Sequence, residues 1–73
     1  MEESAVSDYH INVFYSDDDR GYIADIPDLD ACSAFGGSAE EALAEVEKAK
    51  GAWIAAARDA GKPIPEPRYR PAI

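Results

Sequence analysis

The stretch YHINVFYSDDDRGYIADI, residues 9–26, decides the fold of this chain. In YHINVFY and again in YIADI, successive side chains alternate between two sets, which is the period of a β-strand. The letters SDDDRG between them favour hydrogen bonds from side chain to nearby backbone, and their glycine is free to take a positive φ. The stretch therefore predicts two antiparallel strands, Tyr9–Tyr15 and Tyr22–Ile26, joined by a hairpin turn.

The residues after this hairpin predict a third strand. Pro27 has no N–H for a strand ladder, so the second strand ends before it. After a polar connection, Ala31-Cys-Ser-Ala-Phe35 forms a short strand that stops at Gly36-Gly37. The three strands make a meander.

A long amphipathic helix follows. Ser38 and Glu41 have the spacing of a capping box, and apolar residues then recur every three or four positions from Ala39 to Ala60, among them Leu43. Gly61 suits the left-handed position after a helix, and Pro63 cannot continue one. The prediction is a helix over residues 39–60.

The domain prediction is one α+β unit, a three-stranded antiparallel meander plus one long helix. Residues 1–8 carry no periodicity and are expected to form a flexible leader, so the domain spans residues 9–73. The proline-rich stretch 62–67 should be extended, and Arg68-Tyr69-Arg70 has room for a short fourth edge strand, which would give the order β-β-β-α-β.

Composition restricts the class of partner. Fifteen acidic and seven basic residues give a net charge of −8, which repels nucleic acid and attracts a basic protein. The single Cys32 excludes an intramolecular disulfide, and neither a signal sequence nor a run of about 20 apolar residues is visible. We therefore expect a cytoplasmic protein with no direct contact to nucleic acid or membrane.

Three features invite a catalytic or metal-binding interpretation, and each has a plainer one. The run Asp17-Asp18-Asp19 lacks the downstream glutamate of a calcium loop and suits a hairpin turn. His10 has no neighbouring nucleophile or ligand in its strand, and Cys32 has no CxxC partner. We predict no catalytic residue, no metal site and no cofactor, and hence no enzyme.

Strand alternation points to one surface with a functional meaning. Phe14, Ile23 and Phe35 fall on the sheet face opposite the helix, one from each strand. Two interpretations stay open: the three form an apolar association patch, or the C-terminal segment folds over them. Trp53 lies on the apolar stripe of the helix, which favours a core anchor over a ligand platform.

The motifs together resemble the HicB-like antitoxin family from Tyr9 to Pro67. They read, in order, Tyr9-x-Ile-x-Val, Gly21-Tyr-Ile-Ala-x-Ile-Pro-Asp-Leu29, Cys32-x-Ala-x-Gly36, Ser38-x-x-Glu-Ala-Leu43, Trp53-Ile54 and Gly61-Lys-Pro-Ile-Pro-Glu-Pro67. The resemblance implies a partial RNase H-like fold and an antitoxin that binds and blocks a small, basic, RNA-cleaving HicA toxin. Asp30-Ala31 and Gly37 depart from the usual family residues, so the loops there are expected to differ. Many members carry a further DNA-binding domain, which we do not expect here because the sequence ends at Ile73.

Two functional hypotheses follow. The first is an antitoxin-like inhibitor of a HicA-type toxin, and the alternative is an orphan oligomeric domain that binds another protein or a ligand without a toxin partner. Under either, we expect a homo-oligomer, a dimer or a tetramer of dimers, because one helix covers only one sheet face. The expected interface residues are Phe14, Ile23 and Phe35, with Arg68, Tyr69 and Arg70 at the edge.

Overall fold

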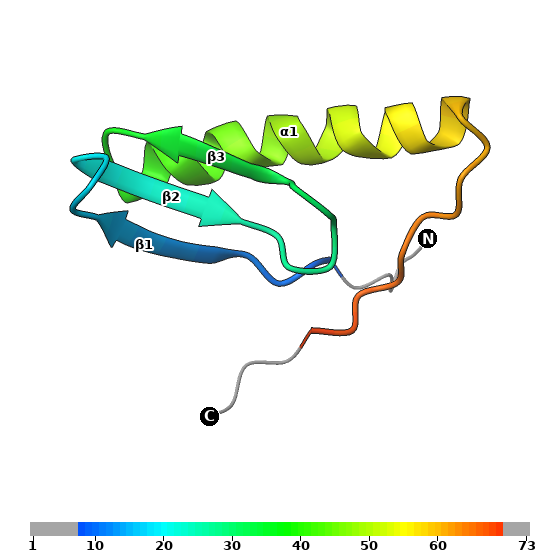
Figure 1. The fold of residues 1–73 in the computed structure, drawn as a ribbon, viewed down its shortest axis with the longest axis horizontal. Helices are drawn as coiled ribbons and strands as arrows, with labels where there is room; N and C mark the ends of the chain where they lie inside the picture. Colours follow the sequence, from blue (N-terminus) through cyan, green and yellow to red (C-terminus); the bar gives the residue numbers. More distant parts are fainter. Residues whose placement is uncertain (1–7, 70–73) are drawn as a thin grey trace.

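A computed structural model of the chain describes residues 8–69. In that part, three antiparallel strands form one sheet in the order β1-β2-β3, and the helix α1 lies across one face of it (Figure 1). The elements are β1 (Asn12–Ser16), β2 (Gly21–Asp25), β3 (Ser33–Gly36) and α1 (Ala39–Asp59). The predicted α+β fold with a three-stranded meander and one long helix is confirmed.

β1 begins at Asn12 and not at Tyr9, and β3 is shorter than predicted because the loop between β2 and β3 is a structured turn. The N–H of Ile26 donates to the Cys32 carbonyl at 3.0 Å, and the N–H of Cys32 donates to the Leu29 carbonyl at 3.3 Å. Ala31 has a φ of 59°, which no strand residue adopts. β3 therefore begins at Ser33 and not at Ala31, and Leu29, predicted to lie in a polar connection, is only 2% exposed.

The hairpin turn is confirmed, but with different backbone geometry. Residues 17–20 form the turn between β1 and β2. The positive φ, 55°, belongs to Arg20, whereas Gly21 is the first residue of β2. The expectation that the glycine supplies this conformation was wrong.

Both ends of α1 follow the predicted signals. The Ser38 hydroxyl accepts from the N–H of Glu41 at 3.1 Å, and the Glu41 carboxylate accepts from the N–H of Gly37 at 2.7 Å, one residue earlier than a capping box requires. At the other end, Gly61 has a φ of 70°, and the N–H of Lys62 donates to the Ala57 carbonyl at 2.8 Å. This is the Schellman ending of a helix.

The core lies between α1 and the inner face of the sheet. Its buried side chains are Ala24, Ile26, Leu29, Cys32, Ala42 and Val46. α1 packs mainly against β3 and least against β1. Val13, which pairs with the buried Ala24 on the helix side of the sheet, is therefore 38% exposed on β1. Leu43 is 40% exposed although its spacing predicted the apolar stripe.

Candidate functional site

The outer face of the sheet, opposite α1, carries a continuous apolar row. Phe14 pairs with Ile23 across β1 and β2, and Ile23 pairs with Phe35 across β2 and β3. Since Ala24 is buried against α1, its neighbour Ile23 points the other way. Phe14 and Phe35 are 48% and 49% exposed, so the three predicted side chains lie side by side on an open surface. We call them the outer row.

Gly21 gives the outer row its flat shape. A Cβ built on Gly21 would lie 2.4 Å from the ring of Phe35, which shows that this ring lies across the glycine. Any larger residue there would push the ring outward. The absence of a side chain at Gly21 therefore lets Phe35 lie over β2 instead of standing away from the sheet.

The described part of the C-terminal segment docks at another place. Figure 1 shows residues 62–69 beside the chain that leads into β1, whereas the outer row crosses the strands themselves. The Tyr9 hydroxyl donates to the Pro65 carbonyl, and the rings of His10 and Tyr69 lie 4.8 Å apart. The interpretation in which this segment covers the outer row does not hold for residues 62–69.

The fourth strand is not formed in the described residues. The Asp28 carboxylate accepts from the N–H of Arg68 at 3.1 Å and from the N–H of Tyr69 at 3.2 Å. Consecutive N–H groups of a strand point to opposite sides, whereas here both donate to one carboxylate, so the backbone at these residues is not a strand. The prediction was wrong for these two residues, and Arg70 lies outside the described residues.

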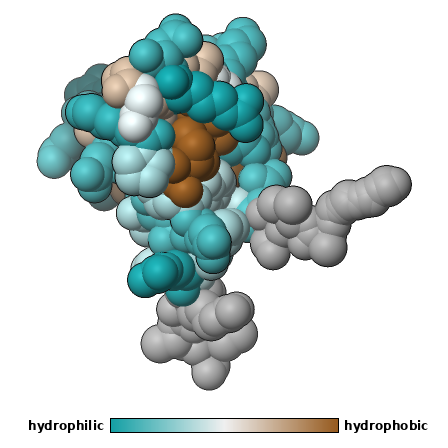
Figure 2. Space-filling model, turned by 90° about the vertical axis from the view of Figure 1, so that its right-hand side faces the viewer, coloured by the Kyte–Doolittle hydropathy of each residue, from teal (hydrophilic) through white to brown (hydrophobic). Residues whose placement is uncertain are grey.

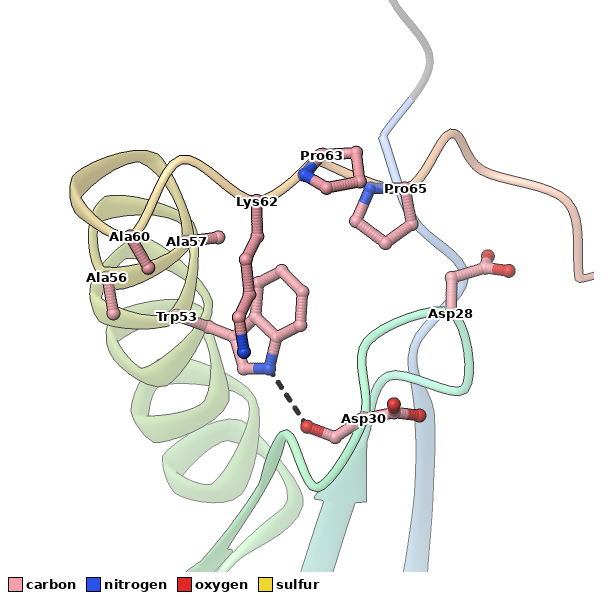
Figure 3. Close-up of a pocket in the computed structure, with 9 residues that line it drawn as sticks. All are labelled: Asp28, Asp30, Trp53, Ala56, Ala57, Ala60, Lys62, Pro63 and Pro65. Carbon is pink, nitrogen blue, oxygen red and sulfur yellow. Dashed lines mark hydrogen bonds between the residues drawn. The ribbon is translucent and has the colours of Figure 1, made fainter.

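A groove opens between the end of α1 and the C-terminal segment (Figure 3). Its volume is about 670 Å³, and one wall is the indole of Trp53, whose N–H donates to the Asp30 carbonyl at 2.9 Å. The other lining residues are Asp28, Asp30, Ala56, Ala57, Ala60, Lys62, Pro63 and Pro65. Trp53 also packs against the core while remaining partly exposed. It is therefore both a core contact, as predicted, and a wall of the groove.

The same end of the molecule shows apolar surface among hydrophilic residues (Figure 2). A second hollow, about 360 Å³ in volume, lies there. Ile54 of α1 and Ile64 of the C-terminal segment both line it and are half-buried. The C-terminal segment thus completes apolar packing that the helix begins.

The acidic turn has the geometry of a structural turn. The Ser16 hydroxyl donates to the Asp19 carboxylate at 2.9 Å, and the N–H of Asp19 reaches the same hydroxyl at 3.4 Å. Asp17 and Asp18 are exposed at the tip of the hairpin. Within residues 8–69, no group of three or more His, Cys, Asp or Glu side chains is placed to hold a metal ion.

The contacts of His10 and Cys32 belong to the packing of the fold. One ring nitrogen of His10, Nε2, lies 2.7 Å from the Asn12 side-chain oxygen. Cys32 is 5% exposed in the core, and burial raises the pKa of its thiol, which disfavours the reactive thiolate.

Among the described residues, no helix has both the length and the apolar character of a membrane span.

A family model described as "HicB_like antitoxin of bacterial toxin-antitoxin system" matches residues 9–70. The chain belongs to this family. A search of curated proteins and a search of solved structures each found no match. The outer row, the groove and the acidic turn all lie within the matched residues, so they are features of the HicB-like domain itself.

One charged cluster of this HicB-like domain was missed by sequence reasoning. The Lys50 ammonium lies 2.9 Å from a carboxylate oxygen of Asp8 and 2.9 Å from one of Glu47. These carboxylates raise the pKa of Lys50, and hydrogen bonding to Lys50 lowers the pKa of Asp8. The three-residue spacing of Glu47 and Lys50 was a visible helical signal. Nothing local connects Asp8, which we had placed in the flexible leader, to residue 50.

Proposed function

We propose that this HicB-like domain is an antitoxin that binds and inhibits a small, basic, RNA-cleaving toxin of the HicA type in the cytoplasm. The observation that carries the proposal is the family match over residues 9–70. Its net charge of −8 supports it, because a protein surface that holds RNA must present positive charge. An acidic protein can cover such a surface without catalysing a reaction.

We assign toxin binding to the tip of the β1–β2 hairpin, which is part of the acidic surface. Its carboxylates follow one another in the chain and are exposed. On α1, Glu41 serves the helix cap, and Glu45 and Glu47 pair with Lys48 and Lys50 at 3.2 and 2.9 Å. The helix carboxylates are therefore interspersed with basic side chains, whereas Asp17, Asp18 and Asp19 follow one another without interruption.

Co-expression with the protein encoded by the adjacent gene tests the proposal. We expect the two chains to copurify and the partner alone to cleave RNA. Adding the HicB-like chain in equal amount should abolish that cleavage. A partner that copurifies but has no ribonuclease activity, or one that cleaves RNA equally well in the complex, would refute the proposed inhibition.

A matched pair of charge variants tests the assigned surface. Asp17→Asn with Asp18→Asn removes two charges from the turn and leaves Asp19, whose carboxylate closes it. Asp59→Asn with Glu66→Gln removes two exposed charges elsewhere. At low salt the turn variant should associate with the toxin several-fold more slowly than the control, and the difference should shrink at high salt because ions screen exposed charges. Equal rates for the two variants would contradict the assignment.

The groove beside Trp53 favours a second candidate function, an oligomeric domain that binds a small ligand or another protein without a toxin. Clefts that hold small molecules typically measure roughly 300–1,000 Å³, and this one measures about 670 Å³. A ligand in the groove would change the fluorescence of Trp53. A saturable fluorescence change with a small molecule, in a chain that binds no ribonuclease, would favour this function over the first.

A further inference from the structure

We propose that the outer face of the sheet is the contact surface of a homodimer, with the outer row of one copy packed on the outer row of the other. The occupant of this face is a second copy of the chain. The inference is independent of the toxin, because it rests only on the geometry and charge of the sheet.

The charge distribution favours a second copy over a basic partner. Two neighbouring sets of paired residues flank the outer row: Asn12, Asp25 and Ser33 on one side, and Ser16 and Gly21 on the other. Asp25 is the one charged residue among them. A basic partner would gain little from such a face in a chain of net charge −8, whereas two copies can meet here without bringing many like charges together.

The shape of the outer row suits two-fold symmetry. Ile23 lies in the middle with one phenylalanine on each side, and Phe35 lies flat over Gly21. A two-fold axis that lies in the interface over Ile23 and runs across the strands places row on row, and it sends the two hairpin tips to opposite ends of the dimer. Such a closed, self-complementary contact is the commonest form of homodimer and leaves no apolar edge for further growth.

Neither α1 nor the described C-terminal segment covers the outer row. α1 lies on the inner face, and residues 62–69 are held beside Tyr9, His10 and Asp28. Phe14 and Phe35 consequently keep about half of their surface exposed in one copy. A domain of 73 residues hides only about 60% of the surface that its unfolded chain exposes, so burying a second sheet face also adds stability.

Sedimentation equilibrium of the wild-type chain over a range of concentrations is the first test, and we expect a monomer–dimer equilibrium. Phe14→Asp with Phe35→Asp should raise the dimer dissociation constant by about 100-fold or more, the usual effect of losing central aromatic contacts. Far-UV circular dichroism should report an unchanged fold, because these rings pack only partly against their own chain. A monomeric wild type would overturn the proposal, as would a folded double variant that still dimerises.

Single substitutions provide the matched control. Leu43→Asp adds the same charge at an apolar side chain that is 40% exposed on α1, whereas Phe14→Asp adds it to the outer row. Only Phe14→Asp should weaken the dimer. If both variants weaken it equally, general charge repulsion and not the outer row explains the effect, and the proposal fails. Should the double variant not fold, Phe35→Ser, which adds no charge, provides the same comparison with wild type.

Discussion

Two glycine-to-alanine substitutions in this chain should have opposite effects on stability: Gly36→Ala should lower it and Gly51→Ala should raise it. Gly36 ends β3 under the first turn of α1, where an added Cβ would lie 2.4 Å from the Ala42 backbone nitrogen and 2.8 Å from the Glu41 carbonyl carbon. Gly51 lies in the middle of α1, where an added Cβ would meet nothing within 4 Å. The same chemical change therefore meets backbone at one site and open space at the other.

The expected magnitudes follow from these contacts. Real Cβ atoms essentially never come closer than 3.0 Å, so Gly36→Ala requires the start of α1 to move away from the sheet by at least roughly 0.6 Å. That movement disturbs Ala42 and Val46, both fully buried, and overpacking of this kind costs about 1–3 kcal/mol. Alanine also makes the unfolded chain less flexible, which stabilises the fold by only about 0.4–1 kcal/mol, so the steric conflict is the larger effect. We expect a net loss of about 1 kcal/mol.

Gly51→Ala should instead raise the free energy of unfolding by about 0.5–1 kcal/mol, because alanine is the better helix former in an exposed helix interior. Urea unfolding followed by far-UV circular dichroism measures both variants. All samples need the same protein concentration, since dimerisation would make stability depend on it. If Gly36→Ala proves as stable as wild type, or Gly51→Ala destabilises, the close approach of α1 to β3 is not as the structure has it.

Three further predictions use the same unfolding assay. Trp53→Ala should lower the free energy of unfolding by about 2–3 kcal/mol, less than truncation of a fully buried tryptophan would. Trp53→Phe loses mainly the hydrogen bond from the indole N–H to the Asp30 carbonyl and should lower it by about 1 kcal/mol. Equal losses for the two variants would contradict a packing role. Ser38→Ala should cost about 1 kcal/mol through its lost cap, and no loss would mean that the cap is dispensable. Because the pKa of Asp8 is lowered, its stabilisation is fully present above its ordinary pKa of 3.8 and disappears as pH falls through the lower folded value. Lys50→Met should remove that part of the acid dependence, and an unchanged pH profile would show that the pair contributes nothing.

The features that sequence predicted correctly depend on neighbours in the chain. The cap at Ser38 and the left-handed Gly61 depend on residues within one helical turn. The outer row follows from the alternation of side chains along each strand, once the three strands pair in order. In these cases local chemistry and the final fold agree, so the pattern was informative.

Most of the features that sequence missed depend on residues far apart in the chain. Asp28 holds the amides of Arg68 and Tyr69 from 40 and 41 positions away, and this contact displaces the predicted fourth strand. Lys50 reaches Asp8 across 42 positions. Leu29 is buried because the turn from Ile26 to Cys32 folds it inward, although its own neighbours are acidic. No period in the sequence marks such contacts.

The two proposals together predict the composition of the toxin complex. The outer row lies on the face opposite α1, and Asp17 and Asp18 extend from the hairpin tip, so a dimer through the outer row leaves both tips free for toxin. We expect two antitoxin and two toxin chains per complex, measured as a mass by light scattering. Phe14→Asp with Phe35→Asp should halve that mass to a one-to-one complex and leave inhibition of RNA cleavage intact, because it removes no contact that we assign to the toxin. A folded double variant that no longer inhibits would mean that toxin, not a second copy, covers the outer row. In that case the wild-type complex should contain one copy of each chain.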